Sequence, residues 1–210
     1  PVHKLEDEFI YNYLLQNGYV SGDILDLGCG TAPILDHLLI PEGKYHGIDV
    51  SNEMIIRAKA KHPGQRFDCV PMEKFSFNRQ YHNIISLFGS FSYADPFMTV
   101  LNICDHLKPG GRFFIMAFGK RYRKRKSYIM NFLGIPSNAS YYSSTELKSH
   151  FYGFQDIKVR GLTLSEYMAN NLPAAISKHY FRSETQIAGR LSPDNCYFLI
   201  ITGEKSAEKI

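Results

Sequence analysis

The sequence lacks an apolar stretch that could cross a membrane, since none approaches the ~20 residues that a transmembrane helix needs. Cysteine is scarce: Cys29, Cys69, Cys104 and Cys196 are scattered, and no two of them form a C-x-x-C pair. We therefore expect reduced, mostly buried thiols in a cytoplasmic protein. The eight histidines also lack the spacing of metal ligands, so no metal site is predicted.

Excess positive charge is confined to one segment. Lysine and arginine number 24 against 20 aspartates and glutamates, which gives a formal net charge of +4. Six of these basic residues lie within residues 120–126, so the rest of the chain holds 18 basic and 20 acidic residues. Nucleic acid is therefore not the expected partner, because a general nucleic-acid binder carries its charge more widely.

The pattern of apolar residues and turn signals predicts one α/β domain over residues 1–210, or one domain with an inserted cap. An N-terminal helix is predicted over 1–19. Strands and helices then alternate, which predicts a doubly wound, mainly parallel sheet of seven strands. The predicted strands are 24–27, 45–48, 66–70, 82–87, 112–118, 154–159 and 196–202. Residues 160–195 separate the last two strands and are predicted to form a helical cap over the pocket.

Ser51 is a predicted helix N-cap, and Ser143-x-x-Glu146 and Thr163-x-x-Glu166 are predicted capping boxes. Another helix is predicted in more detail. Asp95-Pro96 opens it, and Pro109-Gly110-Gly111 is expected to end it before the strand at 112–118. Its predicted buried face consists of Phe97, Val100, Leu101, Cys104 and Leu107.

The most informative stretch is a strand that runs into a glycine turn. Gly28 and Gly30 follow the strand at 24–27 and let the backbone turn sharply where a ligand approaches. Asp49 ends the next strand, 21 positions after Gly28, the separation at which a second parallel strand delivers an acid to a ribose diol. A dinucleotide fingerprint needs a third glycine where this chain has Pro33, which disfavours a nicotinamide oxidoreductase.

These residues resemble the motifs of class I S-adenosylmethionine-dependent methyltransferases. Residues 26–32 (Asp-Leu-Gly-Cys-Gly-Thr-Ala) are similar to the family's first motif, although Ala32 stands where many members have a third glycine. Residues 81–88 resemble the family's fourth strand, and 106–116 resemble the turn into its fifth strand. The resemblance implies a Rossmann-like fold with a reversed last strand. It also implies S-adenosylmethionine as cofactor, with S-adenosylhomocysteine as product.

The resemblance further implies which residues hold the cofactor. Asp49 is expected to accept hydrogen bonds from the ribose hydroxyls, and Gly28 and Gly30 to cradle the methionyl part. Asp26 is expected to reach the ammonium, a favourable pairing because this ligand carries a sulfonium and an ammonium and no pyrophosphate. The predicted cofactor-binding set is Asp26, Gly28, Cys29, Gly30, Asp49, Val50, Met54, Met72, Glu73, Leu87 and Phe88.

The adenine end departs from the family pattern. Pro71 stands where members often have an acid that receives the adenine amino group. The backbone of Met72 would then recognise the adenine amino group in place of that acid, with Glu73 as the alternative residue.

The acceptor is expected to be a small molecule methylated on oxygen or nitrogen. The fourth strand ends at Ser86–Ser90 without the Asn/Asp-Pro-Pro-aromatic tetrad of members that methylate amino groups of bases or glutamine. No Pro-Cys pair for pyrimidine methylation is present either. No general base is identified. The candidates by location are Tyr11, Tyr13, Tyr93, His106, Tyr141, Tyr142 and His179, and acceptor binding is predicted for Tyr13, Arg121, Arg123 and Arg125.

Two other functions remain open at this point. An RNA-modifying methyltransferase of the same fold would use the basic run 120–126 on phosphates, and its affinity would fall steeply with salt. A non-catalytic module would bind S-adenosylmethionine without transferring a methyl group. The oligomeric state is not predicted.

Overall fold

The computed structural model describes residues 2–121, 139–163, 179, 181, 183, 185–188 and 191–207. The helices are α1 (Val2–Gln16), α2 (Ile34–His37), α3 (Asn52–Lys61), α4 (Pro96–His106) and α6 (Ser144–His150). Two 3-10 turns are η1 (Ser90–Tyr93) and η2 (Pro193–Asn195). The strands are β1 (Ile24–Leu27), β2 (Tyr45–Asp49), β3 (Arg66–Cys69), β4 (Tyr81–Ser86), β5 (Leu107–Phe118), β6 (Gln155–Leu162) and β7 (Phe198–Glu204).

The seven strands form one sheet in the order β3-β2-β1-β4-β5-β7-β6. Strands β1 to β5 are parallel, whereas β7 lies antiparallel between β5 and β6. The doubly wound fold with a reversed last strand is thereby confirmed. The chain order switches between β1 and β4, so the connections leaving these strands run to opposite faces and leave a crevice at their carboxyl ends.

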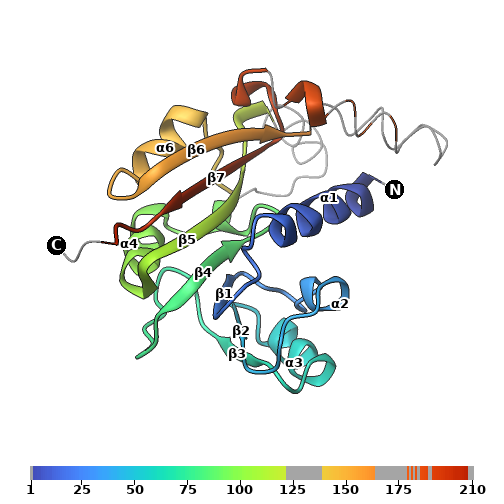
Figure 1. The fold of residues 1–210 in the computed structure, drawn as a ribbon, viewed down its shortest axis with the longest axis vertical. Helices are drawn as coiled ribbons and strands as arrows, with labels where there is room; N and C mark the ends of the chain where they lie inside the picture. Colours follow the sequence, from blue (N-terminus) through green and yellow to red (C-terminus); the bar gives the residue numbers. More distant parts are fainter. Residues whose placement is uncertain are drawn as a thin grey trace, which may run out of the picture.

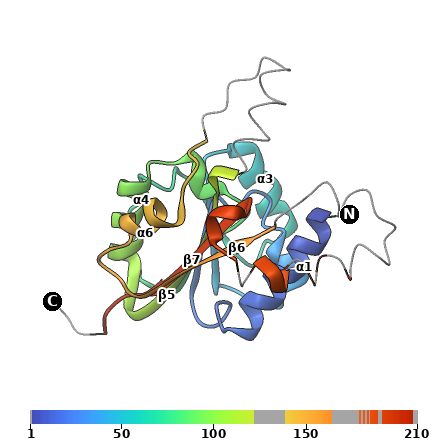
Figure 2. The same cartoon turned by 90° about the horizontal axis from the view of Figure 1, so that it is seen from above.

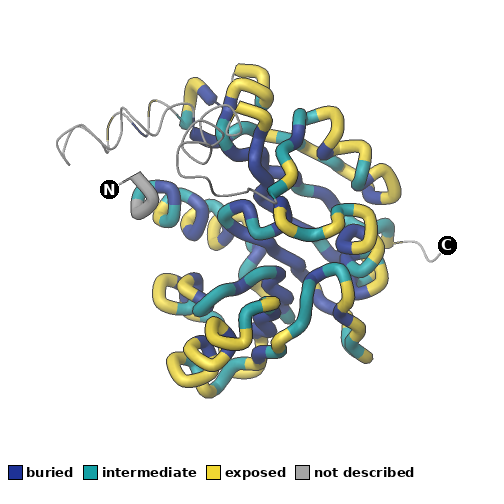
Figure 3. Tube along the Cα trace, turned by 180° about the vertical axis from the view of Figure 1, so that it is seen from behind, coloured by how far each residue is buried: buried dark blue, intermediate teal, exposed yellow. Residues whose placement is uncertain are grey.

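Helices cover both faces of the sheet (Figure 1). Helices α1, α2 and α3 pack on one face, where Ile10, Leu14, Ile34 and Ile55 join a buried cluster with the strands. Helices α4 and α6 pack on the other face through Val100, Ile103, Leu147 and Phe151. Seen from above, the strands run between these two layers (Figure 2). The central strands are buried and the helix surfaces facing away from them are exposed (Figure 3), as a three-layer α/β arrangement requires.

Local capping fixes three helix starts at the positions that the sequence indicates. The Ser51 side chain accepts a hydrogen bond from the Met54 N–H, and Asp95 accepts one from the Met98 N–H at 2.8 Å. Ser143 and Glu146 form the complete capping box that their spacing predicts. Each cap satisfies backbone donors that the first helical turn leaves unpaired.

The predicted buried face of α4 is wrong for two of its members. Phe97 is 59% exposed and Leu101 is 43% exposed, while Thr99, Ile103 and His106 face the sheet instead. His106 belongs there because its ring bridges two backbone groups: Nε2 lies 2.9 Å from the Phe77 nitrogen and Nδ1 lies 2.8 Å from the Asn102 oxygen. Both helix faces carry apolar residues at helical spacing, so the sequence pattern alone did not decide between them.

The structure also moves two boundaries. Leu107, predicted on the helix, and residues 109–111, predicted to end it, both belong to β5, because the Gly110 N–H donates to the Lys205 carbonyl and the Lys205 N–H to the Gly111 carbonyl. Strand β6 continues to Leu162, past the predicted start of the inserted segment at 160. Most of 160–195 lies outside the described residues, as does Glu166, the partner that a second capping box at Thr163 would need.

Candidate functional site

Two cavities, each of about 270 Å³, meet at the carboxyl ends of β1, β2 and β4. The first is lined by Gly28, Asp49, Val50, Val70, Pro71, Met72, Glu73, Ser90, Tyr93 and Ala94. The second is lined by Asp26, Gly28, Cys29, Gly30, Thr31, Pro33, Ile34, Leu87, Phe88 and Ser90. Gly28 and Ser90 line both cavities, which therefore adjoin at these two residues; we call the two adjoining cavities the slot. Ligands of parallel α/β sheets bind in this position.

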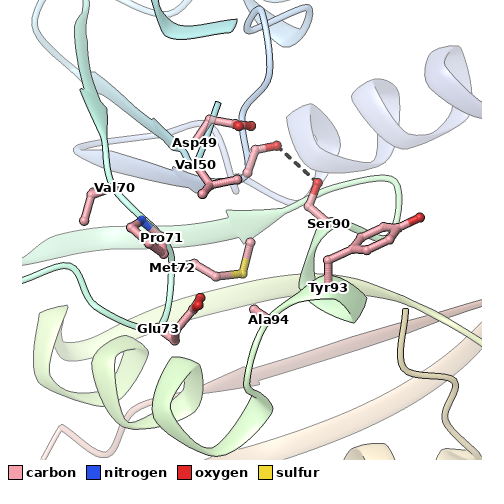
Figure 4. A pocket seen from close by; sticks show the side chains of 10 residues that line it. Asp49, Val50, Val70, Pro71, Met72, Glu73, Ser90, Tyr93 and Ala94 are labelled. Atoms are coloured by element: carbon pink, nitrogen blue, oxygen red, sulfur yellow. Dashed lines mark hydrogen bonds between the residues drawn. The ribbon is translucent and has the colours of Figure 1, made fainter. Parts of the chain in front are cut away.

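The first cavity has carboxylates at opposite ends (Figure 4). Asp49 and Val50 lie at one end and Glu73 at the other, while the Met72 side chain crosses the space between them. A dashed line in the figure marks the 3.2 Å hydrogen bond that the Ser90 hydroxyl donates to the Gly28 carbonyl. This bond ties the turn after β1 to η1, so the two walls of the slot are held together.

The glycine turn after β1 needs both glycines, for different reasons. Gly28 has φ +74°, and a Cβ there would lie 2.5 Å from the Ser90 Cβ and 3.2 Å from the Met72 Cε. Gly30 has φ +56°, but a Cβ there would meet no atom within 4 Å. Both positions require the left-handed backbone that glycine adopts without strain. Gly28 therefore permits close packing of the protein on itself, whereas Gly30 borders open space.

Asp49 is positioned by backbone donors from two loops. Its Oδ2 accepts from the Gly30 N–H at 2.9 Å, and its Oδ1 accepts from the Ser51 N–H at 2.8 Å. A carboxylate offers about four acceptor positions, so each oxygen keeps one for a ligand. Fixed in this way at the end of β2, the group suits two adjacent hydroxyls of a ribose.

Asp26 is a buried carboxyl with one oxygen unpaired. Its side chain lies on β1, the residue is 3% exposed, and Oδ2 accepts a 2.6 Å hydrogen bond from the Tyr45 hydroxyl. Oδ1 has no hydrogen-bond partner. Burial, reinforced by the nearby charge of Asp49, raises the pKa of Asp26 to about 7, although the Tyr45 hydrogen bond opposes the shift. A buried acceptor without a partner is costly, so this site favours a ligand that brings a donor or a cation.

The slot carries acidic groups and no basic ones in the part of the chain that the structure describes. Asp26, Asp49 and Glu73 line the two cavities, while no lysine, arginine or histidine does. A cationic ligand is attracted to such a lining, and a pyrophosphate would be repelled by it.

The predicted cofactor-binding residues differ in whether they line the two cavities. Val50, Met72 and Glu73 line the first cavity, but Met54 does not. The Cys29 side chain points away from the slot toward β2, since a Cβ on Gly47 would lie 2.7 Å from its Sγ, and burial raises the pKa of this thiol. Cys29 therefore offers its backbone to the second cavity and is not a nucleophile.

The turn after β4 supplies the other wall. Leu87 and Phe88 line the second cavity, and Phe88 takes a left-handed backbone with φ +53°. The next residue, Gly89, has φ +85°, and a Cβ there would lie 2.3 Å from the Phe118 ring. This turn folds tightly against β5 and directs Ser90 toward Gly28.

The predicted base candidates lie in different surroundings. Tyr93 lines the first cavity and is 57% exposed. Tyr11 is 3% exposed, and its ring packs against Phe88 at 6.0 Å. Burial raises the pKa of Tyr11 far above its ordinary value, which makes its phenol a poor proton acceptor at neutral pH. Tyr141 is partly buried and stacks on Phe118, while His179 is exposed.

Three further candidates lie away from the slot. Tyr13 lines a separate cavity between α1 and Phe181, and Tyr142 is buried in the cluster under α4 and α6. His106 ends α4 directly before the start of β5, so it lies at the amino-terminal ends of the parallel strands, opposite the slot.

The start of the basic run makes contacts within the chain. Lys120 pairs with Glu146 at 2.6 Å, and the Arg121 guanidinium donates to the Asn195 carbonyl at 2.7 Å. Both cations are therefore engaged in holding neighbouring segments together. Arg123 and Arg125 lie outside the described residues.

Sequence reasoning missed two residues that shape the slot, Tyr45 and Ser90. Tyr45 begins β2 and reaches Asp26 on the neighbouring strand, and Ser90 bonds to a residue 62 positions away. The pairing of β1 with β2 indicates the role of Tyr45. Asp26 lies opposite Gly47 in the parallel ladder, and Tyr45, two residues before Gly47, points to the same face of the sheet as Asp26.

A family model described as a methyltransferase domain matches residues 24–111, the segment that carries the glycine turn, Asp49 and the turn after β4. This match and the methyltransferase relatives below support the class I S-adenosylmethionine-dependent methyltransferase family that the sequence predicts, whose cofactor is S-adenosylmethionine.

Curated methyltransferases match parts of the chain. An N,N-dimethyltransferase of dTDP-3-amino-3,4,6-trideoxy-α-D-glucopyranose from Streptomyces venezuelae is 27% identical over 95 residues, which cover 43% of this chain and 40% of that enzyme. A malonyl-[acyl-carrier protein] O-methyltransferase from Priestia megaterium is 30% identical over 146 residues, which cover 66% of this chain and 52% of that enzyme. The matched residues thus span only about half the length of these relatives.

Solved structures of methyltransferases share the fold. A possible histamine N-methyltransferase from Thermotoga maritima superposes with a TM-score of 0.63 at 16% identity, covering 98% of this chain and 96% of that one. A methyltransferase from Clostridium acetobutylicum gives a TM-score of 0.64 at 15% identity, covering 97% and 92%. At this identity the likeness concerns the fold.

Among the helices that the structure describes, none is long and apolar enough to cross a membrane. Within the same described part of the chain, no group of three histidine, cysteine, aspartate or glutamate side chains gathers as a metal site would require.

Proposed function

We propose that this chain binds S-adenosylmethionine in the slot and transfers its methyl group to an oxygen or nitrogen atom of a small acceptor. The observation that carries the proposal is the placement of Asp49. It ends β2 beside the Gly28–Gly30 turn and holds both carboxylate oxygens in place while leaving acceptor positions free. The three carboxylates of the lining favour a ligand with a sulfonium and an ammonium over a dinucleotide.

The residues present fit this cofactor part by part. Asp49 would hold the ribose diol, and Val50, Pro71 and Met72 would enclose the adenine in the first cavity. The second cavity, which Asp26 lines, would take the methionyl part, and the buried Asp26 Oδ1, which has no partner in the chain, would accept from its ammonium. The junction at Gly28 and Ser90 would lie beside the sulfur.

The cofactor, when bound, supplies a methyl group on a positively charged sulfur that an acceptor atom can displace in line. The contribution of the chain is then alignment, which can lower a barrier by ~7–11 kcal/mol without a strong base. No histidine or lysine among the described residues lines the slot, in keeping with a proximity mechanism. The wall beside the junction is aromatic, with Phe88 on one side and Tyr93 on the other.

A small acceptor is supported by the first relative, whose name specifies an amino sugar nucleotide, whereas the name of the second specifies a malonyl group on acyl-carrier protein. One is an N- and the other an O-methyltransferase, so both acceptor atoms stay within the proposal. The contacts of Lys120 and Arg121 within the chain do not favour the RNA alternative.

Calorimetric titration tests the proposal. The protein should bind S-adenosylmethionine and S-adenosylhomocysteine at micromolar level, and NAD⁺ not at all. Asp49→Ala should weaken binding of both ligands at least tenfold, since a charge-assisted pair to the diol is worth ~1.5–3 kcal/mol. Asp36→Ala is the matched control, because that carboxylate pairs with Lys61 on the surface of α2.

Unchanged affinity in Asp49→Ala would contradict the assignment of Asp49. A parent protein that binds neither ligand would contradict the proposed function. Release of S-adenosylhomocysteine in a screen of small acceptors separates a methyltransferase from a module that only binds the cofactor.

A further inference from the structure

The contact between Tyr45 and Asp26 is unusual for its setting. Two ionisable side chains from adjacent strands share a 2.6 Å hydrogen bond, and Tyr45 is 1% and Asp26 3% exposed. Burial and the neighbouring Asp26 raise the pKa of Tyr45 well above its ordinary value, so this phenol remains a donor. The hydrogen bond therefore occupies Oδ2 of Asp26 and leaves Oδ1 without a partner.

No cation compensates this buried carboxyl in the part of the chain that the structure describes. The ionisable groups that act on Asp26 or on its neighbours include Tyr11 and Asp7 of α1, Cys29 of the turn, Asp36 of α2, and Tyr45 and Asp49 of β2. His37 of α2 stacks on Tyr11 at 4.9 Å. The two groups that act on Asp26 itself, Tyr45 and Asp49, are neutral and acidic, respectively. The pKa of Asp26 is raised to about 7 because the carboxyl is buried and the nearby charge of Asp49 disfavours its ionised form.

We infer that Tyr45 is a positioning residue for the cofactor: its hydroxyl orients Asp26 so that Oδ1 meets the α-ammonium, and binding then releases a proton from Asp26. This inference rests on the proposed function. A ligand cation beside Oδ1 favours the charged carboxylate. Because the Tyr45 hydrogen bond lowers the pKa of Asp26, losing it makes the carboxyl harder to ionise.

The linkage predicts how affinity depends on pH. With a pKa of about 7, Asp26 is about 9% ionised at pH 6 and about 76% ionised at pH 7.5, so S-adenosylmethionine should bind about eightfold more tightly at pH 7.5. If removing the hydroxyl raises that pKa by about one unit, Tyr45→Phe binds about threefold more weakly at pH 7.5 and about ninefold more weakly at pH 6.

The experiment is calorimetric titration of the parent, Tyr45→Phe and Asp26→Asn with S-adenosylmethionine between pH 6 and 7.5. Titration in two buffers of different ionisation enthalpy counts released protons. The parent should release about three quarters of a proton at pH 6.5, and Asp26→Asn none. The control ligand is 5′-methylthioadenosine, which keeps the adenosine and lacks the ammonium, so its affinity should follow neither pH nor Tyr45→Phe.

Tyr81→Phe is the matched control variant. Tyr81 is also fully buried in the sheet, but its hydroxyl pairs with His46 at 2.5 Å, away from the slot. It should leave the pH profile of binding unchanged. If the affinity of Tyr45→Phe depended on pH in the same way as that of the parent, the inference would be overturned. A parent protein that binds S-adenosylmethionine without releasing a proton would also overturn it, and this measurement does not require Tyr45→Phe to fold. A parent that binds neither ligand would instead overturn the proposed function.

Discussion

Replacing each glycine of the turn by alanine should have different consequences, although the two positions are two residues apart. Both have a positive φ, so both variants carry the strain of a left-handed alanine, about 1–2 kcal/mol. Only at Gly28 does the new Cβ collide with neighbours, lying 2.5 Å from the Ser90 Cβ. Overpacking of this kind costs a further 1–3 kcal/mol, approximately.

Gly28→Ala should therefore lower the free energy of unfolding by about 2–5 kcal/mol and Gly30→Ala by about 1–2 kcal/mol. In a domain of this size each kcal/mol shifts the Tm by roughly 2–4 °C. Thermal and urea unfolding of both variants without ligand measure the difference. Gly30→Ala, whose Cβ enters the open slot, should weaken S-adenosylhomocysteine binding more than its small loss of stability suggests.

A double variant isolates the collision. Ser90→Gly in the Gly28→Ala background removes the Cβ that is struck, so it should recover part of the lost stability, while the left-handed strain stays. In the Gly30→Ala background the same change should recover nothing. Equal destabilisation by the two alanines, or no recovery with Ser90→Gly, would refute the distinction between a packing glycine and a ligand-facing glycine.

Two further predictions concern parts of the fold remote from the slot. Ser143→Ala removes the capping box of α6 and should lower stability by about 1 kcal/mol in urea unfolding, with cofactor affinity unchanged; a change in affinity would contradict the separation of α6 from the slot. Burial of Asp23 opposes its ionisation, but hydrogen bonds from Lys44, Arg79 and Lys108 outweigh this and lower its pKa to about 2. Its contribution is thus present above the unfolded-state pKa near 4 and is lost as pH falls toward 2, so Asp23→Asn should flatten the pH dependence of unfolding over that range.

The sequence was sufficient for the parts of the fold that depend on local chemistry. Glycines after β1, an acid at the end of β2 and the caps at Ser51, Asp95 and Ser143 act over a few residues, so their spacing predicted them. The strand alternation predicted the doubly wound sheet for the same reason, because each element has its own period and its own end signals.

What depends on contacts between distant segments was not predictable in this way. The α4 face was misassigned because Phe97 and Leu101 have the same helical spacing as the residues that actually face the sheet. The segment 107–111 became part of β5 because Lys205 pairs with Gly110 and Gly111, a contact that spans some 95 positions.

The candidate site shows the same division. The sequence identified Asp26, Asp49 and the two glycines, but the Tyr45–Asp26 contact depends on the register of β1 and β2, and the Ser90–Gly28 contact joins segments 62 positions apart. The depth at which a carboxyl is buried, and hence its pKa, depends on every layer packed around it. Such properties require the assembled structure.

The most direct test of the account is a crystal structure of the protein with S-adenosylhomocysteine. We expect the ribose hydroxyls at the Asp49 carboxylate, the ammonium at Oδ1 of Asp26 and the sulfur beside the junction of Gly28 and Ser90. Ligand density outside the two cavities, or a ribose that does not contact Asp49, would contradict the account.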